Sequence, residues 1–149
     1  MSEIVVRRAV ERDVPAMAAL EAECFSAPWS ERSLASELGS GNAAFFMAEV
    51  SGAVVGYAGM QTAADEGSVF NVAVAKNSRR MGVGRALARA LTEFAREKGL
   101  AALYLEVRPS NLAAIALYER EGYVFCGLRR DYYTAPKENA ILMKLDLAG

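Results

Sequence analysis

The chain of 149 residues contains no histidine and only two cysteines, Cys24 and Cys126. Without histidine a Ser-His-Asp triad and a Cys-His dyad are excluded, so proton transfer must use Glu, Asp, Lys, Tyr, Cys or water. A zinc site would need carboxylates together with two distant cysteines, and we therefore expect no bound metal. We expect two buried thiols rather than a disulfide, as is usual in the cytoplasm.

Long apolar runs are missing as well. No stretch of about 18 apolar residues is present that would span a membrane. Residues 1–8 lack the basic start, the long apolar stretch and the cleavage site of a signal peptide. The formal net charge of −1 gives no bulk basic field for gripping nucleic acid. We expect a cytoplasmic protein with neither a membrane nor a nucleic acid as a direct partner.

Hydrophobic residues make up 53% of the chain and charged residues 23%, which predicts one globular domain over residues 1–149. Asp13 is a plausible cap for the first helix. The apolar periodicity predicts strands at 3–8, 45–50, 54–61, 67–75, 103–107, 123–130 and 140–147, and helices at 13–23, 30–38, 82–98 and 111–121. The order β-α-α-β-β-β-α-β-α-β-β predicts an α/β fold whose sheet is of mixed strand direction and not doubly wound.

The segment Arg79–Arg85 is a glycine-rich turn between a buried strand and a long amphipathic helix. Free backbone N–H groups and the positive end of the helix dipole make such a turn a site for an anion such as a pyrophosphate. Gly82 and Gly84 let the backbone approach phosphates without a Cβ. Leu87 stands where a dinucleotide fingerprint needs its third glycine, and no P-loop run is present.

The pattern Arg/Gln-x-x-Gly-x-Gly/Ala matches residues 79–84. It resembles the acyl-CoA pyrophosphate loop of the GNAT superfamily of N-acetyltransferases. Taken alone, the same residues also fit an ordinary strand-to-helix turn with a basic flank.

A second segment, Glu106–Tyr118, combines a carboxylate, an amide and a phenol. Asn111 and Tyr118 are seven residues apart and so lie on one helix face. Glu106 ends the preceding strand, where α/β folds gather ligands. Each residue also has a structural interpretation: Glu106 as a solvated charge, Asn111 as a helix cap, which we expect in any case, and Tyr118 as core.

Acetyl transfer from acetyl-CoA to an amine needs a neutral amine, a base and an acid. Glu106 can take the proton lost from nitrogen, directly or through water. Tyr118 can supply a proton to the leaving thiolate, because a phenol with its usual pKa of ~10 is protonated at neutral pH. Asn111 can bind the CoA arm, and the strand amides at 72–74 can hold the pantetheine by β-like pairing.

The resemblance to one family within the GNAT superfamily, the RimI family, covers nearly the whole chain. That family contains bacterial N-terminal alanine acetyltransferases that modify the eighteenth protein of the small ribosomal subunit. The similar runs are Pro28-Trp29-Ser30 and residues 70–74, 79–85, 106–111, 114–119 and 129–133. The resemblance implies the GNAT acyl-CoA N-acyltransferase fold, with a mixed and largely antiparallel sheet flanked by about four helices.

The resemblance also implies residue roles. Glu106 would be the proton acceptor and Tyr118 the proton donor. Trp29, Tyr132 and Tyr133 would line the peptide side, although a core or rim contact is the alternative for each aromatic ring. The residues implied to contact acetyl-CoA are Val72, Ala73, Val74, Arg80, Met81, Gly82, Val83, Gly84, Arg85 and Asn111.

An N-terminal amine is the expected acceptor, with direct transfer and no acyl-enzyme. An α-amine has a pKa of ~8 and a lysine amine ~10.4, so far more of the α-amine is neutral at pH 7. The substrate would be a ribosomal protein, and the sequence favours no particular oligomeric state. Two alternatives remain open here: acetylation of lysine or a small amine, and an acyl-CoA-binding regulatory module without catalysis.

Overall fold

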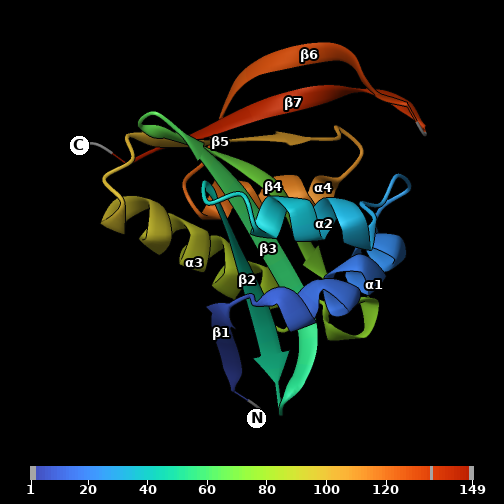
Figure 1. The fold of residues 1–149 in the computed structure, drawn as a ribbon. Coiled ribbons are helices and arrows are strands. Elements are labelled where there is room, and N and C mark those ends of the chain that lie inside the picture. Colours follow the sequence, from blue (N-terminus) through green and yellow to red (C-terminus); the bar gives the residue numbers. More distant parts are fainter. Residues whose placement is uncertain (1–2, 135, 148–149) are drawn as a thin grey trace.

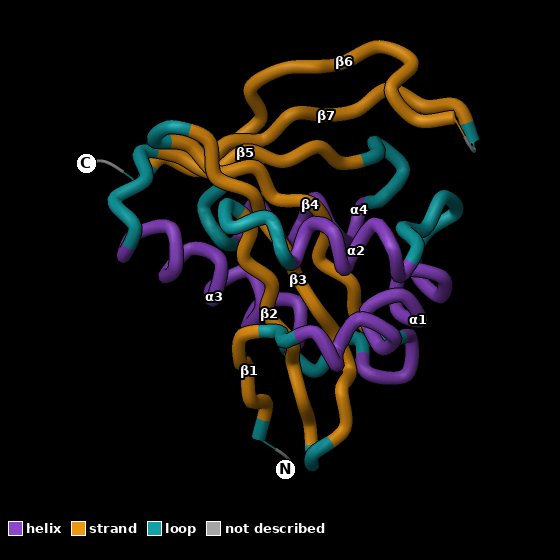
Figure 2. Tube along the Cα trace, in the orientation of Figure 1, coloured by secondary structure: helices purple, strands orange, loops and turns teal. Residues whose placement is uncertain are grey.

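The computed structural model describes residues 3–134 and 136–147, and the elements follow the predicted order (Figures 1 and 2). The strands are β1 (Ile4–Arg8), β2 (Ala43–Val50), β3 (Ala53–Ala63), β4 (Glu66–Val74), β5 (Ala102–Val107), β6 (Val124–Thr134) and β7 (Lys137–Asp146). The helices are α1 (Val14–Cys24), α2 (Glu31–Leu38), α3 (Val83–Glu97) and α4 (Leu112–Arg120). None of these helices is long and apolar enough to cross a bilayer.

One seven-stranded sheet organises the molecule, in the order β1-β2-β3-β4-β5-β7-β6. Only the β4–β5 pair is parallel, and the other neighbours are antiparallel. This confirms the mixed, largely antiparallel sheet with four helices. This is the arrangement that the resemblance to the GNAT superfamily implies.

The two faces of the sheet carry separate hydrophobic cores, because side chains alternate along each strand. On β2, Phe46 belongs to the core shared with α3 and α4, whereas Phe45 and Met47 belong to the core shared with α1 and α2. Figure 1 shows α1 and α2 in front of the strands and α4 behind them. The apolar residues of α3, among them Val83 and Leu87, recur at helical spacing and therefore lie on one face. This face is buried against the sheet.

Strands β4 and β5 pair over only three residues of β4, Glu66 to Ser68. Past that point β4 pairs only with β3, and β5 only with β7. A bulge contributes, because Gly59 pairs with Asn71 and Met60 with Val69, which leaves Phe70 as an extra residue that bends β4. We call the divergence of residues 69–74 of β4 from residues 105–107 of β5 the fork.

The hairpin at the end of the chain is longer than predicted. Strand β6 continues to Thr134 and β7 starts at Lys137, where the periodicity had placed strands at 123–130 and 140–147. Polar residues dominate the extension, so its hydrophobic pattern is weak, and pairing between the two strands, such as Tyr133 with Glu138, decides it. The predicted peptide-side residues Tyr132 and Tyr133 therefore lie inside a strand.

Two smaller expectations are corrected. Asp13 does not cap α1 with its side chain, because the carboxylate accepts from the Val10 N–H (2.8 Å) and pairs with Arg7 (2.8 Å). Both cysteines are free thiols, but neither is fully buried: Cys24 is half-buried, and Cys126 is exposed because β6 is an edge strand.

Candidate active site

The fork exposes main-chain groups of β4. The Ala75 N–H donates to the Val55 carbonyl (2.8 Å), so Ala75 faces β3. Main-chain groups alternate along a strand, so Ala73 also faces β3, while those of Val72 and Val74 face the fork. The Val74 carbonyl accepts from Arg79 Nε (3.2 Å). An extended ligand can therefore pair with Val72 and with the Val74 N–H.

The glycine-rich turn has the backbone that an anion site needs. Gly82 caps α3 with φ +88°, and Arg80 is also left-handed at φ +66°. No side chain caps the helix, and the Ala86 N–H donates to the Gly82 carbonyl (3.0 Å). Amides of the first turn, among them those of Gly84 and Arg85, thus point out of the helix without a side-chain cap.

The start of α3 is fastened to the end of α4. Arg85 and Arg89 both pair with Glu121, at 3.3 Å and 3.1 Å, and the Glu121 side chain is only 8% exposed. A Cβ on Gly84 would lie 3.2 Å from Leu117 Cδ2, so this glycine also lets α3 approach α4. Sequence reasoning missed Glu121. Of the other predicted loop residues, Met81 is exposed and Val83 is core, so Val83 can offer a ligand only its backbone.

Glu106 lies at the tip of β5 on the α1–α2 face. Leu105 and Val107 pack into the α3–α4 core, so Glu106 between them points the other way. Its Oε2 atom is buried and has no hydrogen-bond partner, and Arg129 Nε lies 3.9 Å away. A hydrogen bond from Tyr132 reaches the carboxylate and, after burial, contributes to raising the pKa of Tyr132. The Oε2 atom therefore has an open position for a hydrogen bond.

Tyr118 approaches from the α3–α4 face. It is buried in that core and packs edge-to-face on Tyr123, with ring centroids 5.5 Å apart. Burial raises the pKa of the Tyr118 phenol, and Tyr133 adds to the rise. Burial raises the pKa of Tyr133 to about 12, with Glu106 as the second cause. Tyr133 therefore interacts with both predicted catalytic groups, which come from opposite faces of the sheet.

Asn111 is the N-cap of α4. Its Oδ1 accepts from the Ala114 N–H (3.1 Å), which confirms the structural interpretation. The side-chain amide Nδ2 takes no part in this cap.

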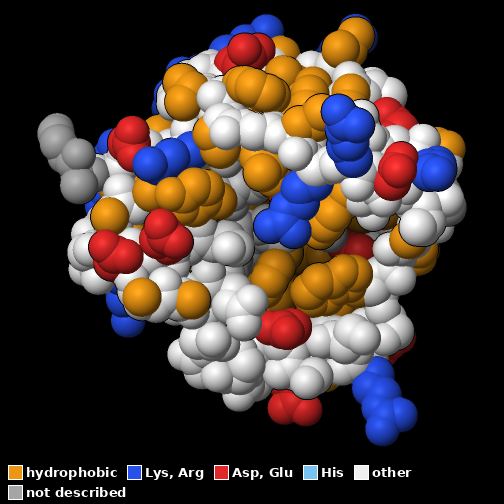
Figure 3. Space-filling view, turned by 90° about the horizontal axis from the view of Figure 1, so that it is seen from above, with side chains coloured by type: hydrophobic (Ala, Val, Ile, Leu, Met, Phe, Trp, Pro, Cys, Tyr) orange, Lys and Arg blue, Asp and Glu red, His pale blue; other side chains and the backbone are white. Residues whose placement is uncertain are grey.

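Three segments meet on the side predicted for the peptide. The Trp29 ring, between α1 and α2, lies 5.2 Å from that of Phe70 in the β4 bulge. Tyr132 and Tyr133 pack edge-to-face at 5.0 Å. The guanidinium carbon of Arg108 lies over the Tyr133 ring, 4.2 Å from its centroid. Seen from above, this end of the molecule is hollowed, with apolar side chains inside and basic side chains beside them (Figure 3).

Arg108 joins these segments. Its guanidinium donates to the Pro136 carbonyl (2.7 Å) and to Glu138 (3.2 Å), and it contacts Ser26 Oγ (3.4 Å) in the α1–α2 connection. Glu138 also accepts from Ser110 Oγ (2.8 Å). Arg108 was visible in the sequence only as part of the motif 106–111, without a role. Its position holds the β6–β7 hairpin beside Glu106.

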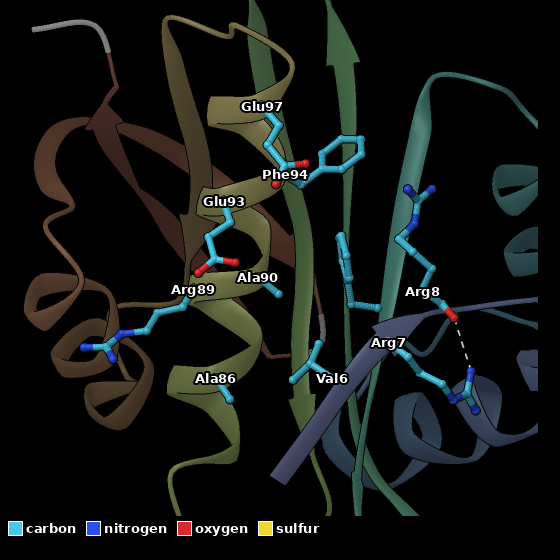
Figure 4. A pocket seen from close by; sticks show the side chains of 10 residues that line it. Val6, Arg7, Arg8, Ala86, Arg89, Ala90, Glu93, Phe94 and Glu97 are labelled. Carbon is cyan, nitrogen blue, oxygen red and sulfur yellow. Dashed lines mark hydrogen bonds between the residues drawn. The ribbon is translucent and has the colours of Figure 1, made fainter.

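A pocket of about 400 Å³ lies elsewhere, between β1 and α3 (Figure 4). Its wall includes Arg8, whose guanidinium carbon lies near two rings, 5.4 Å from the centroid of Phe46 and 5.1 Å from that of Phe94. None of the predicted site residues lines this pocket, so the fork remains the candidate site. Among the described residues, no group of three or more His, Cys, Asp or Glu side chains is placed to hold a metal ion.

Comparison with known proteins agrees with this geometry. The acetyltransferase (GNAT) family model matches residues 14–123. The chain is 40% identical over 138 residues to the [ribosomal protein bS18]-alanine N-acetyltransferase of Escherichia coli K12, covering 91% of this chain and 93% of that protein. It is 37% identical over 140 residues to the N-alpha-acetyltransferase RimI of Mycobacterium tuberculosis, covering 90% and 87%.

A solved structure gives the same result for the fold. The crystal structure of the ribosomal-protein-S18-alanine N-acetyltransferase from Escherichia coli superposes with a TM-score of 0.90 at 37% identity, covering 99% of this chain and 96% of that one. The resemblance to the GNAT and RimI families is thereby confirmed. With its forked sheet, its glycine-capped helix and these relatives, the chain belongs to the GNAT family of acetyltransferases.

Proposed function

We propose that this protein transfers the acetyl group of acetyl-CoA to the α-amine of a protein N-terminus, and that its substrate is the N-terminal alanine of ribosomal protein bS18. The observation that carries the proposal is the unbonded, buried Oε2 of Glu106 at the mouth of the fork. The similarity to relatives named for that reaction supports the choice of substrate. A ribosomal substrate also fits a cytoplasmic location.

Acetyl-CoA has a natural path along the α3–α4 face. The pyrophosphate binds the amides of residues 82–85 and the positive end of the α3 dipole. Arg80 and Met81 complete this turn. The pantetheine pairs with Val72 and Val74, and Asn111 offers its amide to the same arm. The thioester then lies in the fork, between Glu106 and Tyr118.

The acceptor enters from the α1–α2 face. Trp29, Tyr132 and Tyr133 form its walls, and its nitrogen attacks the thioester carbon. Glu106 takes the proton that nitrogen loses, the C–S bond breaks, and Tyr118 protonates the departing thiolate. Glu106 then releases the proton that it took and the Tyr118 phenolate takes one up, so both residues return to their starting forms and the net products are the acetylated amine and free CoA. The histidine-free chain offers no activated cysteine, which favours direct transfer.

The lower pKa of an α-amine favours a protein N-terminus over a lysine side chain as the acceptor. The difference of about 2.4 between their pKa values corresponds to about 3 kcal/mol for supplying the neutral amine. A carboxylate base such as Glu106 suffices for an amine that is already partly neutral.

The decisive experiment measures free CoA released from acetyl-CoA with two peptides. One begins Ala-Arg and has blocked lysines, and the other has a blocked N-terminus and free lysines. We expect turnover on the first peptide alone, with mass spectrometry placing the acetyl group on the α-amine. Turnover on the second alone would move the activity to lysine. If neither peptide led to release of CoA, the remaining explanations would be a small-amine acceptor or a non-catalytic acyl-CoA-binding module.

A further inference from the structure

Glu21 is a carboxylate that neither the predicted chemistry nor the phosphate turn uses. It lies on α1 and its side chain is completely buried. Each hydrogen bond that the described residues give it comes from a neutral donor. A desolvated carboxylate is costly to keep unless such donors compensate it.

The three donors come from three different segments. The Trp29 main-chain N–H, in the α1–α2 connection, donates to Oε1 (2.9 Å). Asn71 Nδ2, beside the β4 bulge, donates to Oε2 (2.9 Å). The Tyr57 hydroxyl, on β3, also donates to Oε2 in a short hydrogen bond. One buried side chain thus fixes the α1–α2 connection against the two strands that flank the bulge.

The same bonds place the acceptor-side wall. Trp29 packs on Phe70, and Phe70 in turn stacks on Phe45, with centroids 5.8 Å apart. Phe70 is the bulge residue and Asn71 follows it, and both lead into the fork. Removing the carboxylate leaves the Trp29 N–H without its buried acceptor, so the connection must move outward to reach water.

We infer that Glu21 is a positioning residue that holds the Trp29 wall against the β4 bulge and thereby sets the affinity for the acceptor peptide. This inference rests on the proposed function for its kinetic consequence. Its structural part concerns Trp29 alone and stands independently of the substrate.

Trp29 is the only tryptophan in the chain, so its fluorescence reports the anchor directly. Glu21→Met replaces the carboxylate by an apolar chain of similar length, and Glu21→Asp retracts the charge from its donors. We expect acrylamide quenching of Trp29 to increase at least twofold in both. Glu21→Gln keeps one acceptor oxygen for the Trp29 N–H, and its amide nitrogen can donate to the Tyr57 hydroxyl and to Asn71 Oδ1 once the Asn71 amide turns over, so quenching should stay near the wild-type value. Glu31→Met, at an exposed position, is the matched control.

Steady-state kinetics of the same variants distinguish a positioning role of Glu21 from a general loss of stability. In Glu21→Met and Glu21→Asp, KM for the Ala-Arg peptide should rise at least fivefold, while kcat and KM for acetyl-CoA stay within twofold. Unchanged quenching and unchanged peptide KM would overturn the inference, and so would a parallel change of kcat and both KM values with a lowered Tm. If Glu21→Met does not fold, Glu21→Asp decides. If the wild type acetylates neither peptide, the proposed function fails, and quenching still decides the anchor.

Discussion

At the scale of single residues, Glu106 is the carboxylate on which the proposed chemistry depends. The sequence places a carboxylate at the end of a strand, which by itself also fits a solvated charge. The structure adds that one oxygen is buried and unbonded, and that Tyr132 holds the group. A group held in this way has the geometry of a general base.

Replacing that base gives the first prediction. Glu106→Gln should lower kcat by roughly 10²–10³-fold, because the amide cannot accept the proton and a general base contributes about that factor. Acetyl-CoA affinity, measured by titration calorimetry, should be unchanged. Glu119→Gln, an exposed carboxylate on α4, should keep full activity. A Glu106→Gln enzyme with normal kcat would remove this residue from the reaction.

Tyr118 leads to a prediction about pH. Burial raises its pKa above the usual ~10, so the phenol stays protonated at every pH below that value. The rate should rise with pH as an α-amine of pKa ~8 becomes neutral, and should show no fall assignable to Tyr118 below pH of about 10. Tyr118→Phe should lower kcat at every pH in that range without changing the shape of the profile. A wild-type alkaline limb near pH 8, absent from Tyr118→Phe, would contradict this assignment.

At the scale of elements, the start of α3 has an unusual helix cap. Its cap is a glycine with a positive φ, which leaves the first-turn amides to a ligand instead of a side chain. The glycine spacing predicted this turn, because the requirement for a left-handed residue is local.

Gly82→Ala tests that requirement. Alanine at φ +88° should destabilise the native turn by about 1–2 kcal/mol and raise KM for acetyl-CoA up to about tenfold as the turn rearranges. Gly41→Ala provides the control, since Gly41 also has a positive φ (+76°) and open space, but lies between α2 and β2. Its urea midpoint should fall similarly with KM unchanged. Equal KM values in the two variants would show that the turn does not bind the cofactor.

The β6–β7 hairpin illustrates what local pattern misses. Its extension has few apolar residues, and Arg108 holds it from β5 through Pro136, Glu138 and the Tyr133 ring. These contacts join residues far apart in the sequence, so no window of the chain displays them. The extension matters because it brings Tyr132 and Tyr133 to the predicted base.

At the scale of the whole molecule, the fork divides the sheet. The two parts of the sheet on either side of the fork are joined there by only three residue pairs between β4 and β5. A cofactor lying in the fork touches both parts and so binds the native state alone.

Acetyl-CoA should therefore stabilise the protein strongly. At a concentration 100 times Kd the gain is about 2.7 kcal/mol, which corresponds to a rise in Tm of about 5–11 °C for a chain of this size. Differential scanning fluorimetry measures the shift, and hydrogen exchange should show new protection at Val72 and Val74. Glu106→Gln should give the same shift. If acetyl-CoA left the Tm unchanged, cofactor binding at the fork would be contradicted.

The sequence by itself determined the kind and order of the elements, the glycine-rich turn before α3 and the residues proposed for catalysis. Those features rest on apolar periodicity, on glycine at a left-handed position and on a contiguous motif, all of which are local. Only the tertiary structure decided that β7 lies between β5 and β6, that Glu106 and Tyr118 lie on opposite faces of the sheet, and that Glu21 is buried among three donors. These arrangements arise from pairing and packing between distant segments, whose free energy no single stretch of the chain contains.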